Sequence, residues 1–375
     1  VKVTTGAILN LNNTVGQQID LGAGSLNLGA GASGSASLGL DIGALNAYDR
    51  IVTTGVATAA NKVIVNLTGL PGLAAGSYDL FTAASGLNGA TFSIGDLKTF
   101  GGFTFGLSQT DTAVTLTTTA LPTNLYWRVG ADVSWSSLNY ANYDTNFSTD
   151  LAGTTNAKGF PGIANKVIFS ATPGAATSAY VTTLDGSFTV GSLQFTSTPS
   201  GITSVTIAQG GPDLTSALTI APASSSDGIA IDDNAGSILI SAPLVLGAPQ
   251  TWTIAGTGSN GSSLTVSGAI SGAAGNNLTI AGLPGAIVNF SGLNTYAGST
   301  SFPGLVLLAG ATNTFSPNSS YILSAQSGTD AVLRLNGFNN VIGSLAGTGF
   351  VENASATTGI TLTVGKNNAT ADFAG

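Results

Sequence analysis

Three chemically versatile residue types are missing from this sequence. The chain of 375 residues contains no cysteine, no histidine and no methionine. A disulfide, a thiolate metal site and a histidine ligand are therefore impossible. A Ser–His–Asp triad cannot be assembled either, because it has no base. These absences remove the commonest hydrolytic and zinc-dependent chemistries before any motif is considered.

Charged residues are also scarce in this sequence. Charged residues make up 7% of the chain, whereas they are about a quarter of an average soluble domain. The net charge is −8, and the nine lysines and arginines are scattered without a cluster. Nucleic acids and anionic membranes are bound by concentrated basic surfaces, so the sequence predicts neither as a partner. No apolar run is long enough for a transmembrane helix.

Glycine and aliphatic residues dominate what is present. The chain has 52 glycines, and hydrophobic residues make up 43%. Short runs alternate β-branched residues or leucine with Thr, Ser or Asn, which is the period-two pattern of half-buried strands. Examples are 62–67, 113–117, 237–240, 263–266 and 360–364. Glycine-containing turns separate these runs, so the sequence predicts an all-β protein rather than a disordered one.

The spacing of the strands favours a solenoid. Beyond residue 200, strand centres recur roughly every 8 to 19 residues, as expected when two or three strands make each coil of a parallel β-helix. Stacked coils would place Val, Leu and Ile inside and Thr, Ser and Asn outside. An array of antiparallel β-sandwiches has similar strand spacing and is the alternative. We predict the parallel β-helix, because small residues occupy the expected corners.

The segment 286–310, AIVNFSGLNTYAGSTSFPGLVLLAG, carries a family resemblance. It resembles the autotransporter-associated β-strand repeat of large bacterial surface proteins. The stretch 40–120, with 76–83 (GSYDLFTA) and 87–92 (LNGATF), is similar to the segment that closes the β-helix of many autotransporter passengers. This resemblance implies a secreted, extracellular bacterial scaffold. It also implies a β-helix whose modules follow one another along a longer molecule.

Three regions are predicted along the chain. Residues 1–121 are expected to be the end of one β-helix with its closing segment, in which aromatic rings plug the end of the core. Residues 122–170 form an aromatic, Asn-rich junction or start segment. Residues 171–375 are expected to be a second β-helix that continues beyond the chain end. Solenoid ends need caps, so uncapped ends would favour head-to-tail stacking or covalent continuation.

Two groups of aspartates are candidate calcium ligands, since Ca²⁺ prefers carboxylate and carbonyl oxygens. The first group is Asp227, Asp232 and Asp233, and the second is Asp144 with Asp150. Neither has the spacing of a known calcium loop or of the calcium-binding β-helix repeat. The alternative for both groups is an ordinary solvated turn, and no other cofactor is predicted.

Four aromatic residues could form a platform on which sugars stack. They are Trp127, Trp135, Tyr140 and Tyr143. The alternative is that they pack inside a core or cap. Runs such as 115–117 and 361–363 contain two threonines and are reminiscent of ice-binding solenoids, but they are too scattered to predict a regular array.

Catalysis is not predicted. A glycosidase needs two carboxyl groups that face one sugar, whereas Asp232 and Asp233 are adjacent and point to opposite faces of a strand. Glu352 is the single glutamate, and no G-x-S-x-G elbow occurs. The sequence therefore predicts a non-enzymatic extracellular protein that forms a stalk, fibre or matrix by self-association. An adhesin that binds surface glycans is the alternative, and a polysaccharide-active enzyme is a remote one.

Overall fold

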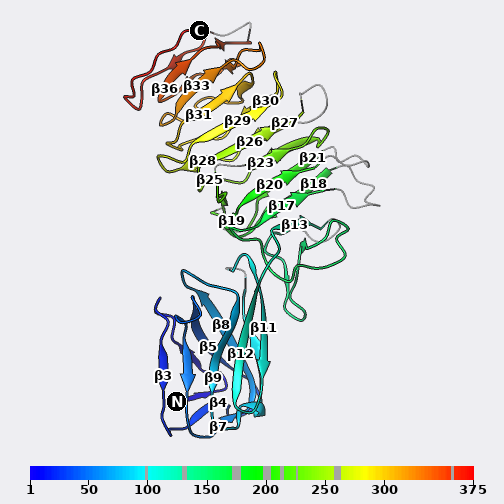
Figure 1. Cartoon of the computed structure of the whole chain (residues 1–375), viewed down its shortest axis with the longest axis vertical. Helices are drawn as coiled ribbons and strands as arrows, with labels where there is room; N and C mark the ends of the chain where they lie inside the picture. Colours follow the sequence, from blue (N-terminus) through cyan, green and yellow to red (C-terminus); the bar gives the residue numbers. More distant parts are fainter. Residues whose placement is uncertain are drawn as a thin grey trace. The chain divides into compact units, whose positions relative to one another are not determined.

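The structure is a computed structural model of residues 1–375, drawn in Figure 1. It describes residues 1–97, 100–128, 133–170, 179–196, 204–211, 215–224, 227–256, 263–355 and 359–375. The fold is all-β, and its stacked parallel sheets form a β-solenoid of about 13 turns. The prediction of a parallel β-helix is confirmed, and the sandwich alternative is wrong. The chain divides into two compact units, Val1–Leu121 and Pro122–Gly375.

Unit 1 (Val1–Leu121) is built from three consecutive coils of three strands each. The strands of the coils are β1 (Lys2–Thr4), β2 (Ile8–Asn10) and β3 (Gln18–Asp20); β4 (Leu26–Ala30), β5 (Ser35–Ile42) and β6 (Arg50–Val52); β7 (Ala57–Ala59), β8 (Asn61–Gly69) and β9 (Gly76–Thr82). Strands at equivalent positions pair in parallel, for example β2 with β5 and β5 with β8. Leu38 and Val65 are partners on the inward face and are fully buried.

The far end of unit 1 is closed by an antiparallel hairpin. After the 3₁₀ turn η1 (Leu87–Gly89) and β10 (Ala90–Ile94), β11 (Phe103–Gln109) and β12 (Ala113–Ala120) form the hairpin, and β12 pairs with β9. The Gln109 side chain donates to the carbonyl oxygens of Leu87 and Ala90 at 3.2 and 2.7 Å. Phe105 of β11 and Phe100 are both buried, and their ring centroids lie 5.1 Å apart. The hairpin thus covers apolar surface and satisfies carbonyl groups at this end.

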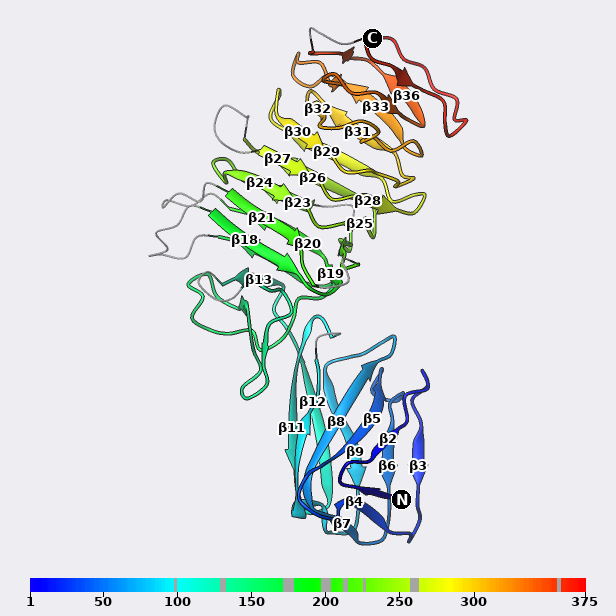
Figure 2. The same cartoon turned by 180° about the vertical axis from the view of Figure 1, so that it is seen from behind.

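Two long sheets form most of unit 2 (Pro122–Gly375), and Figure 2 shows them side by side. The ten-stranded sheet runs β16 (Phe147–Ser148), β13 (Asn124–Trp127), β17 (Lys166–Phe169), β20 (Ser192–Phe195), β23 (Asp227–Ile231), β26 (Gln250–Ile254), β29 (Leu278–Gly282), β31 (Thr300–Pro303), β33 (Ser320–Ser324) and β36 (Ser344–Gly347). The eight-stranded sheet runs β18 (Ala179–Leu184), β21 (Ser204–Gln209), β24 (Ser237–Ile240), β27 (Ser263–Val266), β30 (Ile287–Phe290), β32 (Val306–Ala309), β34 (Val332–Arg334) and β37 (Phe350–Glu352). All pairs are parallel except β13 with β16.

The third side of unit 2 is less regular. A four-stranded sheet contains β19 (Phe188–Val190), β22 (Leu218–Ile220), β25 (Leu244–Leu246) and β28 (Ile270–Gly272). A parallel pair follows further along, β35 (Asn340–Val341) with β38 (Leu362–Thr363). Each coil therefore contributes one strand to each long sheet, and four coils close the third side with a regular sheet. The hairpin β14 (Leu138–Asn139) and β15 (Asp144–Thr145) lies before the first coil.

Strict register explains why the chain needs so many small residues. In the ten-stranded sheet, Leu193, Ile229 and Trp252 occupy one inward column, and all three are fully buried. At the corners the chain passes directly over the preceding coil. A Cβ on Gly268 would lie 2.0 Å from the carbonyl oxygen of Ala242, and one on Gly292 would lie 2.3 Å from that of Gly268. Only glycine fits such a close approach of backbone to backbone.

The described residues include no helix long and apolar enough to cross a membrane.

Candidate functional site

The aromatic segment at the start of unit 2 forms a packed plug. Trp127 and Trp135 lie with ring centroids 5.9 Å apart, and each packs against Phe147 at 5.4 and 5.6 Å. Trp135 also reaches Phe188 of the first coil at 5.4 Å. Exposed fractions of 5% for Trp127 and 0% for Trp135 show that both rings are internal. The plug covers the first coil with large apolar area, as expected where a solenoid core begins.

Hydrogen bonds fix the plug to the eight-stranded sheet. Trp135 Nε1 donates to Thr182 Oγ1 at 3.1 Å, and the Trp135 backbone N–H donates to the carbonyl of Thr183 at 2.9 Å. Asp185 accepts from Ser134 Oγ at 2.5 Å and from the Ser136 backbone N–H at 3.1 Å. Burial raises the pKa of Asp185, but these hydrogen bonds outweigh it and hold the pKa below its ordinary value. Asp185 is therefore an ionised anchor for the plug.

The four aromatic residues predicted to bind glycans do not share one exposed surface. Trp127 and Trp135 are buried in the plug, whereas Tyr140 is 55% exposed. Tyr143 is half-buried in the β14–β15 turn and has a φ of 60°. Sugar stacking requires an accessible ring face, which among these four only Tyr140 clearly offers. The tryptophans have the packing role that was the alternative, and their part in glycan binding has no geometric support.

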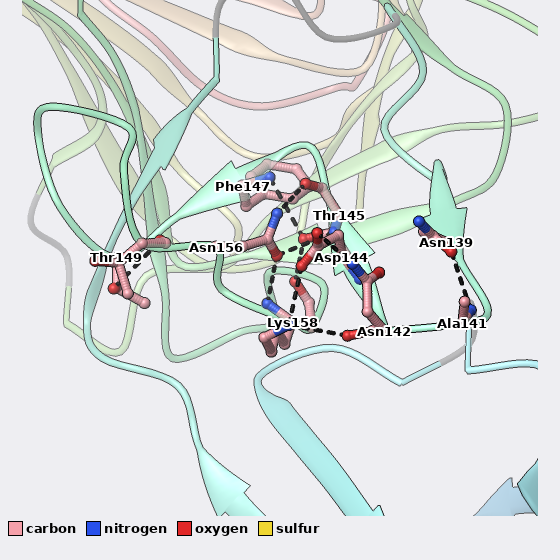
Figure 3. A network of polar contacts seen from close by, with 11 residues as sticks. Asn139, Ala141, Asn142, Asp144, Thr145, Phe147, Thr149, Asn156 and Lys158 are labelled. Atoms are coloured by element: carbon pink, nitrogen blue, oxygen red, sulfur yellow. Dashed lines mark hydrogen bonds and ion pairs between the residues drawn. The ribbon is translucent and has the colours of Figure 1, made fainter.

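A polar network stabilises the turn between β14 and β15, as Figure 3 shows. Asp144 accepts from Asn142 Nδ2 at 2.8 Å and from Lys158 Nζ at 3.0 Å. Asn156 accepts from the backbone N–H of Thr145 at 3.1 Å and donates to the carbonyl of the same residue at 2.7 Å. The Asp144 carboxylate is thus engaged by a cation and an amide. These bonds give Asp144 a structural role in the turn.

Asp150 organises the next loop by itself. Its two oxygens accept from the backbone N–H groups of Thr154 and Thr155 at 3.1 and 2.6 Å. The hydrogen bond from the Thr154 backbone is the main cause that holds the pKa of Asp150 well below its usual range. Asp144 and Asp150 therefore serve two separate loops.

The other proposed calcium ligands are also dispersed. Asp227 is exposed at the start of β23 and accepts from Thr253 Oγ1 at 2.7 Å. Asp232 and Asp233 follow β23 in a turn, half-buried and exposed respectively. Within the described part of the chain, no three Asp or Glu side chains come close enough to hold a metal ion. The calcium hypothesis stays a prediction, and no carboxylate cluster supports it.

Sequence reasoning missed a carboxylate pair in unit 1. Asp41 and Asp49 are both fully buried. Asp41 accepts from the backbone N–H groups of Asn13 and Thr14 at 2.9 and 2.7 Å, and Asp49 accepts from those of Gln17 and Asp41 at 2.9 and 2.8 Å. The pair ties the loop after β2 to the second coil. No sequence signal marks it, because both residues resemble ordinary turn aspartates.

A buried ladder of amides in unit 2 was missed as well. Asn294 and Asn340 are 2% and 1% exposed, and both lie on the third side, beyond the four-stranded sheet. Thr314 lies between them and is fully buried. A signal was present, since Asn–Thr pairs occur at 294–295 and 313–314 and an Asn–Asn pair at 339–340. These pairs recur at about the interval of one coil.

A depression on unit 1 has a volume of about 370 Å³ and is lined by Asn66, Leu67, Thr68, Gly69 and Asp96.

Comparison of the chain with protein-family models, with curated proteins and with solved structures gave no match. The resemblance to autotransporter repeats therefore stays a prediction from the sequence.

Proposed function

We propose that this protein is a non-enzymatic structural protein whose β-solenoid modules stack head to tail into an extracellular stalk, fibre or matrix. One observation carries the proposal. Parallel strands repeat in register through both units, so each coil is a template for the next. Backbone hydrogen bonds run along the stacking direction, and apolar columns fill the interior at about 25 cal/mol per Å² of buried surface.

The edges of the sheets support self-association as the mode of assembly. In unit 1, β1, β2 and β3 each pair with one neighbour only. An unpaired strand edge presents backbone donors and acceptors to any matching strand. Ile8 on β2 is 75% exposed and Val15 in the following loop is 61% exposed, which adds apolar surface there. A coil from another copy, or from further polypeptide, is the partner that this edge fits.

The location outside a bacterial cell rests on the sequence resemblance and on the absence of cysteine. A cysteine-free chain crosses an oxidising compartment without forming disulfides. Surface glycans are the ligand class of the alternative, an adhesin. That alternative has a single clearly exposed aromatic residue among its predicted ligands, Tyr140. For a polysaccharide-active site, the carboxylate pair Asp41 and Asp49 is fully buried and offers no accessible acid to a sugar.

Electron microscopy of concentrated protein, with an edge-blocked variant beside it, tests the proposal. Odd-numbered residues around Ile8 bond to β5: the carbonyl of Ala7 accepts from the N–H of Ser37, and the N–H of Leu11 donates to the carbonyl of Gly39. Alternation along a strand directs the Ile8 N–H to the free edge. Ile8→Pro removes that donor and leaves the internal ladder intact.

We expect filaments from the wild type and from the control Ile8→Ala, and short or no filaments from Ile8→Pro. Discrete globular monomers of the wild type at high concentration would contradict the proposal. Equal filament lengths for Ile8→Pro and Ile8→Ala would show that this edge is not used.

A further inference from the structure

The outer face of the eight-stranded sheet of unit 2 is defined by strand register. Buried residues such as Ile238, Leu264 and Leu333 point inward, and the residues on either side of each point outward. Two outward columns therefore run along the sheet. The first column ends in Ile287, Val306, Val332 and Phe350, which are partners on four successive strands. The second contains Val181, Leu239 and Leu308.

This face is electrically neutral. The charged side chains on the eight strands are Arg334 and Glu352, which neighbour each other in the second column and form an ion pair at 2.5 Å. No lysine or arginine occurs in the sequence between Lys166 and Arg334. An acidic partner therefore finds no unpaired opposing charge on the strands of this face. The strands of a second copy add no like charge, because their one ion pair neutralises itself.

The face is also more apolar than its neighbour. Val181 is 54% exposed and Phe350 is 55% exposed, and Leu239 and Leu308 are half-buried. Most of the equivalent outward positions of the ten-stranded sheet carry smaller side chains, such as Ala230, Thr253, Thr279, Ala281 and Ser301, and the exception Ile322 on β33 is 39% exposed. Stacking of the eight-stranded face would remove larger apolar side chains from water, and it therefore gains more free energy than stacking of the other face.

We propose that the outer face of the eight-stranded sheet stacks against the same face of a second copy of this chain. The contact is lateral and brings two solenoids side by side, with the sheets about 10 Å apart as in other sheet-on-sheet packing. It deepens the proposed structural role by naming how filaments would bundle, and that use rests on the proposed function. The contact itself needs no end-to-end stacking.

The area that the contact can bury indicates whether two single chains would form a stable complex. Eight strands about 4.8 Å apart and about four residues long give a footprint on the order of 450 Å² per copy. The total of roughly 900 Å² lies below the 1,200–2,000 Å² of stable complexes. A pair of single chains should therefore associate weakly and reversibly. Many modules in a row would bind strongly through avidity.

Analytical ultracentrifugation of the full chain carrying Ile8→Pro, which blocks head-to-tail stacking, tests the proposal across a wide range of concentrations. The Ile8→Pro protein should show a mass that rises with concentration. Adding Leu239→Lys and Leu308→Lys places like charges on the face, and this variant should stay monomeric. Adding Ala230→Lys and Ala281→Lys instead puts the same charge on the outer face of the ten-stranded sheet, and this control should associate like the Ile8→Pro protein. Circular dichroism confirms that each variant is folded.

A charge-reversal experiment shows whether the lysine variant fails to associate because of charge repulsion or because it is misfolded. Mixing the Leu239→Lys and Leu308→Lys variant with a Leu239→Glu and Leu308→Glu variant should restore association through opposite charges, and added salt should weaken only this mixed pair. Because all of these proteins carry Ile8→Pro, the result does not depend on head-to-tail stacking, and the two proposals can fail separately. An Ile8→Pro protein that stays monomeric throughout would overturn the lateral proposal. Equal loss of association in the control would overturn it too.

Discussion

The third side of unit 2 closes in two different ways along the same solenoid. In the first four coils, the strands β19, β22, β25 and β28 form a regular sheet with an aliphatic and aromatic inner face, such as Leu218 and Leu244. In the next two coils, residues 293–299 and 311–319 form no strand. A few backbone bonds between coils remain there, such as that from the Thr295 N–H to the Ile270 carbonyl at 2.8 Å. Side-chain amides and hydroxyls supply the other bonds between these coils. The first region therefore depends mainly on the burial of apolar side chains, and the second depends more on buried hydrogen bonds.

The amide ladder shows how the replacement works. Asn294 Oδ1 accepts from the backbone N–H of Ile270 at 2.8 Å, and Asn294 Nδ2 donates to the carbonyl of Thr314 at 2.7 Å. Asn340 Oδ1 accepts from the N–H groups of Thr314 and Phe315 at 2.9 and 3.1 Å. Each amide thus joins successive coils, as a strand pair would. The comparison shows that where a coil has no regular strand, side chains satisfy buried backbone groups that a strand partner would otherwise satisfy.

A hydroxyl cluster completes this region. Tyr296 and Tyr321 are fully buried, and their hydroxyl groups lie 3.3 Å apart. The Tyr321 hydroxyl also accepts from the Ser316 N–H at 2.8 Å. Burial raises the pKa of Tyr321 well above its ordinary value, so the phenol stays neutral. The region therefore has a polar interior without a charge.

Removing an amide of the ladder should have the largest effect on stability. Asn340→Ala leaves two buried N–H groups unpaired, each costing about 1–3 kcal/mol. We expect a loss of about 4 kcal/mol in the free energy of unfolding, measured by chemical denaturation of unit 2 through tryptophan fluorescence, since all three tryptophans lie there. Asn339→Ala is the matched control: Asn339 Oδ1 accepts one exposed bond, from the Thr361 N–H at 2.7 Å, and because water can replace it the loss should be about 1 kcal/mol or less. Equal losses for the two variants would contradict the ladder.

Truncating an apolar side chain of the four-stranded sheet should lower the free energy of unfolding by less than Asn340→Ala does. Leu244→Ala removes a fully buried side chain from the four-stranded sheet and should lower the free energy of unfolding by about 3 kcal/mol, since such truncations cost about 2–5 kcal/mol. Val245→Ala, at the outward position next to it, should change stability by less than about 1 kcal/mol. A Leu244→Ala loss that exceeds the Asn340→Ala loss would reverse the ranking of the two regions.

A fall in pH should stabilise unit 1 through Asp49 and destabilise unit 2 through Asp185. Burial raises the pKa of Asp49 in unit 1, against the backbone hydrogen bonds from Asp41 and Gln17. Folding then favours the neutral acid, so this contribution is present below the unfolded pKa of 3.8 and is lost as pH rises through the folded pKa. Asp185 in unit 2 has a lowered pKa, so its contribution is present above pH 3.8 and is lost as pH falls further.

Hydrogen exchange followed by mass spectrometry resolves the two units in one sample. Unit 1 should gain protection as pH falls from neutral towards 4 after correction for intrinsic exchange, and Asp49→Asn should remove that gain. Asp185→Asn should change only unit 2. If Asp49→Asn leaves the pH profile of unit 1 unchanged, then Asp49 is not the titrating group.

The exposed ion pair of the plug segment should matter least. The Lys158 and Asp144 side chains are 52% and 37% exposed, so solvent screens their attraction. Lys158→Ala should lower the free energy of unfolding by less than about 1 kcal/mol, and added salt should shrink the difference. A loss comparable to that of Leu244→Ala would show that the β14–β15 turn is coupled to the core.

Period-two alternation made the architecture predictable. Strands such as β24 and β27 were visible as Ile-Leu-Ile and Leu-Thr-Val runs, and their parallel stacking follows from small residues at the corners. The predicted sites fared differently. Trp127 and Trp135 are residue types that often bind sugars, but in this fold both rings are buried in the plug. Exposure is a property of the whole fold, so composition alone could not separate the two roles.

The sequence by itself determined an all-β solenoid without thiol, imidazole or basic-patch chemistry, because alternation, glycine corners and missing residue types are local properties. Only the tertiary structure decided which polar residues turn inward, as Asn294, Asn340, Asp41 and Asp49 do. It alone also placed Leu239 and Leu308 on one neutral outer face. The reason is physical: a strand has two faces, and which one meets the core depends on coils that lie one full turn away in the chain.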